Sequence, residues 1–221
     1  MAALTLTFDN GPEPEVTPYV LDVLRERGIL STFFVIGEKL LDPPRLALAE
    51  RARAEGHRIG NHTFTHSLPL GLMRNEGAAE AEIARTQELI SELADPDKLF
   101  RPFGNGGIIS RALLSKAAVD HLVGGGFSCV LWNAIPRDWE EPEGWVERAL
   151  DLSARQDWTL IVLHDLPTGA MAHLPRFLDA MAARGVTFRQ EIPPDLMPIR
   201  RGRIMRPLDD YVSAGLAELS A

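Results

Sequence analysis

Two groups of polar residues in this 221-residue chain have the types and spacing that hydrolysis requires. Asp9 and Asn10 end the strand-like run "LTLTFDN", and His62 and His66 are four residues apart in "HTFTH". One helical turn or a tight loop can direct such a histidine pair at a single metal ion. A hydrolytic zinc site needs three nitrogen or oxygen ligands and one open position, so the two groups together suggest metal-assisted hydrolysis.

Further residues suited to acid–base chemistry follow the later strand-like runs. Asp9 could take a proton from water, and Arg101 could keep its carboxylate ionised through a charge-assisted pair. His164 follows the apolar run "TLIVL" and is either a core residue or a proton donor. Asp138 would favour the second role by accepting a hydrogen bond from one ring nitrogen, and Trp139 could form an apolar wall. A structural salt bridge, a chance histidine pair and simple packing remain as alternatives for these residues.

These residues require a fold that gathers strand ends at one edge. Strands are predicted over 4–10, 31–37, 57–63, 98–104, 127–134, 158–165 and 186–192. Helical spacing occurs over 14–28, 43–56, 73–94, 110–126, 143–157 and 171–185. This alternation predicts parallel strands in an open sheet or a barrel, with the site beyond their C-terminal ends, and seven strands suit an incomplete barrel.

The length and composition favour one domain over residues 1–221. From about residue 193 the pattern loses its period, so we expect an irregular C-terminal extension with a short helix in "DDYVSAGLAEL". The Arg-rich stretch "RRGRIMR" in this extension is either a solvated segment that pairs with acidic surface or an interaction patch.

The charge and the lone cysteine limit the classes of partner. A net charge of −8 makes nucleic acid and an anionic membrane poor candidates. Cys129 is the only cysteine, which excludes an intramolecular disulfide. No apolar run approaches the roughly 18 residues of a membrane span, and no export signal is visible, so we expect a cytoplasmic protein. The oligomeric state is left open.

Taken in order, these stretches resemble the polysaccharide deacetylases of the NodB-homology type, carbohydrate esterase family 4. "TFDNGP" is similar to the first family motif, TFDDGP, and "HTFTH" to the second, H-(S/T)-x-x-H. "RPF" with "GNGG", "RDW" and "IVLH" resemble the remaining three motifs. The resemblance implies an α/β fold, a distorted (β/α)7 barrel of the NodB-like type. It also implies a hydrolase that cleaves an amide C–N bond in an N-acylated saccharide with the help of a divalent metal, expected to be zinc.

The resemblance also assigns roles to the matching positions. Asp9 would be the general base, braced by Arg101, and His164 would be the general acid, tuned by Asp138. The other assigned residues are the metal ligands Asn10, His62 and His66 and the substrate-binding residues Phe103, Trp139 and Leu163. Of these, Trp139 and Leu163 would line the acyl pocket, and a backbone N–H near Phe103 would help to hold the oxyanion.

Two departures from the family pattern affect these assignments. Asn10 replaces the ligand Asp, which removes one negative charge and leaves an amide oxygen as a weaker donor. Weak metal binding, a different metal and a metal-free mechanism therefore all stay open, as do deamidation and engineering of this position. The loop "RPFGNGG" also replaces a longer Pro-Tyr-Gly element, and a cytoplasmic enzyme more plausibly meets a soluble amide than a cell-wall polymer.

Three functional hypotheses follow. The leading one is N-deacetylation of an amino sugar or a similar N-acyl compound by metal-assisted acid–base catalysis. The alternative is an amidase that acts on small linear or cyclic amides, with or without a metal. The third is a catalytically silent carbohydrate-binding member that kept the pocket and lost the full ligand set at Asn10.

Overall fold

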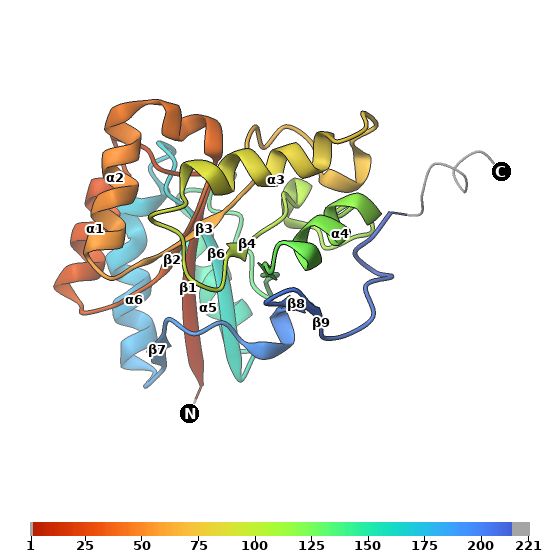
Figure 1. Cartoon of the computed structure of the whole chain (residues 1–221). Helices are drawn as coiled ribbons and strands as arrows, with labels where there is room; N and C mark the ends of the chain where they lie inside the picture. The colour runs from red at the N-terminus through yellow and green to blue at the C-terminus, as the bar shows by residue number, and fades with distance from the viewer. Residues whose placement is uncertain (1, 214–221) are drawn as a thin grey trace. The chain divides into compact units, whose positions relative to one another are not determined.

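The computed structural model describes residues 2–213 and contains two compact units that are interleaved along the chain (Figure 1). Unit 1 consists of Met1–Val35, Lys39–Ile59 and Trp132–Leu196. Unit 2 consists of Ile36–Glu38, Gly60–Leu131 and Met197–Ala221. We describe each unit by itself, and the assignment of one catalytic domain to residues 1–221 stays a prediction.

Unit 1 is built around a fully buried parallel strand, β1 (Ala3–Asp9). Along its whole length β1 pairs with β6 (Trp158–His164), which lies beside it in Figure 1. On its other edge, the first residues of β1 pair with β7 (Thr187–Arg189) and the last ones with β2 (Thr32–Val35). β6 contains the apolar run that is typical of a strand buried on both faces, and β1 alternates leucine with the β-branched residue threonine. Both strands therefore lie within one residue of their predicted bounds.

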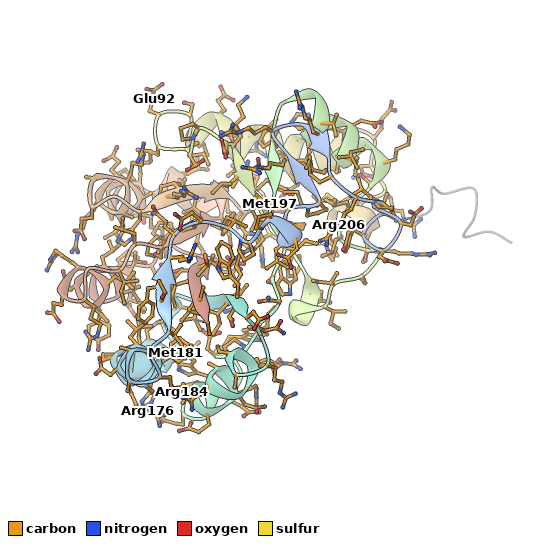
Figure 2. The ribbon with its side chains drawn as sticks, turned by 90° about the horizontal axis from the view of Figure 1, so that it is seen from below. Glu92, Arg176, Met181, Arg184, Met197 and Arg206 are labelled. Atoms are coloured by element: carbon orange, nitrogen blue, oxygen red, sulfur yellow. The ribbon has the colours of Figure 1, made fainter. Side chains whose placement is uncertain are left out.

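Four helices belong to unit 1: α1 (Thr17–Glu26), α2 (Pro43–Ala54), α5 (Trp145–Ser153) and α6 (Leu174–Ala183). Each has its apolar side chains on one face, as helices that cover a sheet require. Figure 2 shows this difference on α6, where Arg176 lies at the outer edge of the helix and is exposed, whereas Met181 is 2% exposed. The buried side chain of Trp145 on α5 packs against Phe177 on α6, with 5.3 Å between ring centroids.

Unit 2 carries the shorter strands and two helices. The strand β3 (Arg58–Asn61) ends in this unit, where Asn61 pairs in parallel with β4 (Leu99–Phe100). β4 in turn pairs in parallel with β5 (Ser128–Cys129). The helices are α3 (Ala78–Leu89) and α4 (Lys116–Gly124), and α4 begins with Ser115, whose side chain accepts a hydrogen bond from the Ala118 N–H. The order of strands and helices from β1 to β7 confirms the predicted βα alternation.

The strands β4 and β5 are much shorter than the predicted segments 98–104 and 127–134, each having only two residues. Lys98 has a left-handed backbone with φ of 46°, which precludes an extended start to β4. Pro102 lacks a backbone N–H, so the ladder cannot continue through it. The pairing of β5 with β4 ends at Val130, whose N–H reaches the Phe100 carbonyl at 2.8 Å. Ala134, at the end of the predicted segment and in unit 1, instead forms an isolated parallel bridge with Ile161 of β6.

The segment after residue 193 is more ordered than the predicted irregular extension. It contains β8 (Ile199–Arg200) and β9 (Arg203–Ile204), which form a hairpin turned by Arg201 and Gly202, both with positive φ. β8 pairs with β5 in antiparallel orientation. Of the helix predicted in "DDYVSAGLAEL", residues 209–211 form a turn and Val212 forms an isolated bridge with Leu114 instead, and residues 214–219 lie outside the described part. None of the helices within residues 2–213 is both long and apolar enough to cross a lipid bilayer.

Candidate active site

Asp9 and His164 lie next to each other at the C-terminal ends of β1 and β6 in unit 1. They are register partners in the parallel ladder, so their side chains point to the same face of the sheet. The exposed fraction is 4% for Asp9 and 9% for His164. The structure thus brings together the residues predicted as general base and general acid, in a position sheltered from solvent.

Asp138 holds His164 through two hydrogen bonds. Its Oδ2 accepts the backbone N–H of His164 at 2.8 Å, and its Oδ1 lies 2.9 Å from the ring Nδ1. Because a carboxylate can only accept, this geometry assigns a proton to Nδ1 and directs Nε2 away from Asp138. Burial alone would lower the pKa of His164, but the charge and hydrogen bond of Asp138, with the charges of Asp9 and Asp165, hold that pKa above its usual value.

Trp139 forms one wall beside the imidazole of His164. The two rings meet edge to face, with 4.7 Å between centroids and 76° between planes. The guanidinium of Arg137 lies 5.9 Å from the Trp139 ring centroid, and Arg137 itself has a left-handed backbone with φ of 57°. Leu163, the other residue predicted to line the acyl pocket, is fully buried in β6 opposite Phe8.

Asn10 follows β1 in a left-handed conformation, with φ of 73°. Lys39 fixes this bend by donating from Nζ to the Asn10 carbonyl at 2.7 Å, and it also pairs with Glu13. Arg45 binds the other Glu13 oxygen at 2.6 Å and the Pro12 carbonyl at 2.7 Å. The side-chain Oδ1 of Asn10 is buried and has no hydrogen-bond donor among the described residues.

A second buried carboxyl, that of Asp165, lies behind the same loop. Thr17 donates from Oγ1 to Asp165 Oδ2, and a Cβ on Gly11 would come within 2.3 Å of both Asp165 carboxyl oxygens. Only glycine therefore fits at position 11 of the "TFDNGP" motif. Burial raises the pKa of Asp165 to about 6, although the hydrogen bond from Thr17 acts in the opposite direction.

In unit 2 the loop after β3 brings the two predicted metal-binding histidines together. The ring centroids of His62 and His66 are 4.7 Å apart. His62 is 3% exposed, and its Nδ1 lies 2.8 Å from the Arg101 carbonyl, so Nδ1 carries the proton and Nε2 keeps its lone pair. Phe103 covers the other histidine, with 3.9 Å between its ring centroid and that of His66.

Arg101 follows β4 and is fully buried. Its backbone N–H donates to the Asn61 carbonyl at 2.9 Å, and its Nε donates to the Val130 carbonyl at 3.4 Å. A buried guanidinium needs a negative or strongly polar environment, which agrees with the predicted role of bracing a carboxylate.

Amide oxygens and imidazole nitrogens, the donor types at the predicted ligand positions, both suit a divalent metal ion. Among residues 2–213 no group of three or more His, Cys, Asp or Glu residues is arranged to hold a metal. By the resemblance, Asn10 stands where the TFDDGP motif has its third such residue. Unit 1 contains the Asn10 Oδ1, a buried amide oxygen that has no donor among the described residues. Unit 2 contains the adjacent imidazoles of His62 and His66, and the Nδ1 of His62 is directed at the Arg101 carbonyl.

The structure therefore describes the predicted residues in two groups. Unit 1 contains Asp9, Asn10, Asp138, Trp139, Leu163 and His164; unit 2 contains His62, His66, Arg101 and Phe103. Sequence reasoning missed Lys39 and Glu82, whose side chains hold the loops after β1 and β3. Lys39 gives no sequence signal, but Glu82 does, because it is a charged residue on the apolar face of a predicted helix.

Comparisons with known proteins identify the family of the chain. Residues 2–119 match the polysaccharide deacetylase family. A chitooligosaccharide deacetylase from Rhizobium leguminosarum bv. trifolii is 36% identical over 162 residues, which cover 72% of this chain and 70% of the relative.

Two solved structures of similar proteins share the fold. The Bc1960 peptidoglycan N-acetylglucosamine deacetylase is 26% identical, with a TM-score of 0.72 over 91% of this chain and 90% of that one. A family 4 carbohydrate esterase from Streptomyces lividans, in complex with acetate, is also 26% identical, with a TM-score of 0.70 over 89% and 96%. The chain therefore belongs to the polysaccharide deacetylase family, a family of hydrolases that act on carbon–nitrogen bonds, and it has their NodB-like distorted (β/α) barrel fold.

Proposed function

We propose that this protein removes the acetyl group from an N-acetylated amino sugar in a saccharide. The observation that carries the proposal is the position of Asp9 beside the His164–Asp138 pair at the ends of β1 and β6. The family of the chain and the names of its relatives, which include a chitooligosaccharide deacetylase, support the choice of substrate class.

In this proposal water attacks the amide carbonyl, the C–N bond breaks, and acetate and a free amine are formed. Asp9 accepts the proton of the attacking water, and Arg101 would brace its carboxylate through a charge-assisted pair. His164 donates a proton from Nε2 to the departing nitrogen, while Asp138 keeps the proton on Nδ1 and stabilises the charged ring. The raised pKa of His164 suits this role, because the ring stays protonated at a higher pH.

The remaining predicted residues bind substrate. Trp139 and Leu163 would line the pocket for the acetyl group, and a backbone N–H near Phe103 would donate to the oxyanion. The edge-to-face contact of Trp139 with the imidazole supports this assignment, since a methyl group beside the ring would also be shielded from water.

We further propose that a divalent metal, zinc in the first instance, is held by His62, His66 and Asn10. When bound, the metal would polarise the amide carbonyl and lower the pKa of water. His62 and His66 would bind through imidazole nitrogens and Asn10 through Oδ1, the buried oxygen without a donor. The lost charge at Asn10 predicts weaker binding than a carboxylate would give.

The test is acetate release from N-acetylated chitooligosaccharides by the full chain with added zinc. Asp9→Asn and His164→Ala should each lower turnover by about 10²–10⁴-fold, the usual contribution of general acid–base catalysis. Asp179→Asn and His173→Ala make the same kinds of change at exposed or half-exposed positions and should leave turnover unchanged. Wild-type turnover in Asp9→Asn or His164→Ala would refute the mechanism.

One observation favours a second candidate, a catalytically silent saccharide-binding protein. Asn10 removes the only carboxylate of the motif's ligand set, so the chain could bind an N-acetylated sugar without turning it over. Calorimetric titration with a chitooligosaccharide distinguishes the two: binding without acetate release under any added metal supports the silent protein.

A further inference from the structure

The loop that carries His62 and His66 has an unfavourable backbone. Thr63 and His66 both have left-handed conformations, with φ of 67° and 51°. Such a φ is costly for a β-branched residue like Thr63, and a loop of this kind persists only where its surroundings hold it. The bend is also what brings the two imidazoles to 4.7 Å of each other.

Glu82 on α3 binds this loop between the two histidines. Its Oε2 accepts the backbone N–H groups of Phe64 at 2.9 Å and Thr65 at 2.8 Å. Its Oε1 accepts the hydroxyl of Thr65 at 2.9 Å. Three donors from two consecutive residues therefore converge on one carboxylate, which is only 9% exposed.

The next residue along the helix makes a second connection to the same loop. The Ile83 carbonyl accepts the side-chain amide of Asn61 at 2.8 Å, and Asn61 Oδ1 accepts the Thr63 N–H at 3.0 Å. The short segment Ile36–Glu38 completes the set, with the N–H groups of Gly37 and Glu38 donating to the Thr63 and Phe64 carbonyls. Every backbone polar group of Thr63 and Phe64 is thus satisfied, and Glu82 supplies the one charged partner.

A charged residue at this position is not explained by helix packing. The buried face of α3 is formed by Ala79, Ile83 and Thr86, and Glu82 lies on that face. A carboxylate removed from water is costly unless hydrogen bonds compensate it, and an apolar side chain would pack there without that cost. The compensation comes wholly from the histidine loop, so the carboxylate and the loop conformation depend on each other.

We propose that Glu82 is a positioning residue, which holds the loop 62–66 so that the imidazoles of His62 and His66 converge on one cation. The part that concerns the cation rests on the proposed function, whereas the effect on the loop does not. Partners behind metal ligands typically change metal affinity by 10–100-fold when they are removed.

Three variants separate the effect of the charge of Glu82 from the effect of its side-chain length. Glu82→Ala removes all three acceptors. Glu82→Asp keeps the charge but shortens the side chain by one methylene, so its carboxylate falls short of the loop. Glu82→Gln keeps one oxygen for the two backbone N–H groups, and its amide can donate to Thr65 Oγ1, which also lies 2.7 Å from Ser67 Oγ. The glutamine variant should therefore rescue most of the function that alanine loses.

Two control variants test whether the loss of any glutamate from α3, or a lower stability alone, produces the same effects. Glu88→Ala removes an exposed glutamate from the same helix, and Leu122→Ala lowers stability from α4, where Leu122 is fully buried. Neither residue has a hydrogen bond to the loop. Both controls should keep wild-type behaviour in the measurements below, even where Leu122→Ala unfolds at a lower urea concentration.

The first measurement uses the metal-free full chain and NMR. Wild-type protein should show a nuclear Overhauser effect between the His62 and His66 rings and slow exchange of the Phe64 and Thr65 amides. Glu82→Ala and Glu82→Asp should weaken the effect and speed exchange of those two amides at least tenfold. If the Overhauser effect between the two rings and the exchange rates of the two amides are unchanged in these variants, the proposal is overturned, whether or not the protein binds a metal.

The second measurement is the zinc dissociation constant, obtained by competition with a chromophoric chelator. It should rise by about 10–100-fold in Glu82→Ala and by much less in Glu82→Gln. An unchanged constant in Glu82→Ala, where wild-type protein binds zinc, would also overturn the proposal. If Glu82→Ala does not fold, Glu82→Asp decides in the same way. A wild-type chain that binds no zinc contradicts the proposed function instead, and the NMR measurement still decides the role of Glu82.

Discussion

Replacing Asp138 by asparagine should remove the general acid while leaving the fold in place. Asp138 is fully buried and accepts two hydrogen bonds, from the backbone N–H of His164 at 2.8 Å and from its ring Nδ1 at 2.9 Å. In Asp138→Asn only one of these partners can meet an oxygen. The backbone N–H has no other conformation to adopt in β6, so it keeps the oxygen, and the new NH2 group faces the ring.

This exchange disfavours the protonated ring of His164 for two reasons. A donor facing Nδ1 requires that nitrogen to be unprotonated, and the negative charge that raised the pKa of His164 is gone. General acid catalysis contributes about 10²–10⁴-fold, so Asp138→Asn should lower kcat/KM at least about 10²-fold, equivalent to about 2.7 kcal/mol of transition-state stabilisation. The loss should grow with pH, because the falling pKa moves the alkaline limb of the profile to lower pH.

The assay is the pH dependence of acetate release for both proteins, with circular dichroism and thermal unfolding to verify the fold. Glu143→Gln is a matched control, since it makes the same chemical change beside a half-exposed histidine, His173, whose Nε2 lies 2.9 Å from Glu143. The control should retain the wild-type profile. An alkaline limb that does not move in Asp138→Asn, or a loss of equal size at every pH, would refute the assignment of His164 as the acid tuned by Asp138.

Three further changes test the ligand position and the buried titratable groups. Asn10→Asp should lower the zinc dissociation constant at least tenfold, because it restores a carboxylate at the donor position; an unchanged constant in a competition titration would contradict that assignment. Burial lowers the pKa of His57 to about 4, so relative to His57→Asn the wild-type protein should lose about 3 kcal/mol of unfolding free energy as the pH falls from 6.5 through 4. Burial raises the pKa of Asp165 to about 6, so its contribution to the free energy of unfolding is full below pH 3.8 and is lost as the pH rises through 6. Relative to wild type, Asp165→Asn should therefore gain about 3 kcal/mol of unfolding free energy across that window. Urea unfolding at several pH values measures both effects, and parallel curves for variant and wild type would contradict the cited pKa shifts.

The long buried strands and the residues at their ends could be predicted from the sequence. β6 contains a continuous apolar run, β1 alternates leucine with threonine, and the C-terminal ends of adjacent parallel strands meet at one edge of a sheet. That rule was sufficient to place Asp9 near His164. The pairing of His164 with Asp138 followed from chemistry alone, since a histidine that acts as an acid needs a carboxylate behind it.

The short strands could not be predicted, because their existence depends on partners rather than on local pattern. β8 and β9 have two residues each, and only the pairing of β8 with β5 and the turn at Arg201 and Gly202 define them. The predicted lengths of β4 and β5 were wrong for the same reason, since Pro102 cannot continue the ladder between them and Ala134 bridges to β6 instead. The hydrogen bonds that Lys39 and Glu82 make to the loops after β1 and β3 depend on the backbone path of those loops, which the hydrophobic periodicity of a sequence does not describe.

The conformation of Asn10 predicts that its effect on the proposed metal site would be one of charge rather than shape. Its φ of 73° lies in the left-handed region, which asparagine and aspartate both tolerate. Lys39 holds this bend through the Asn10 carbonyl, which is the same in either residue, so the exchange of side chains leaves the loop in place. The two residues differ only in their side-chain group. In Asn10 the Oδ1 is buried and has no donor among the described residues, so a bound cation would offset the cost of removing this oxygen from water. In the proposed metal site the amide would keep the backbone position of a ligand and lose the electrostatic attraction of a carboxylate, and the change in zinc affinity in Asn10→Asp measures that attraction directly.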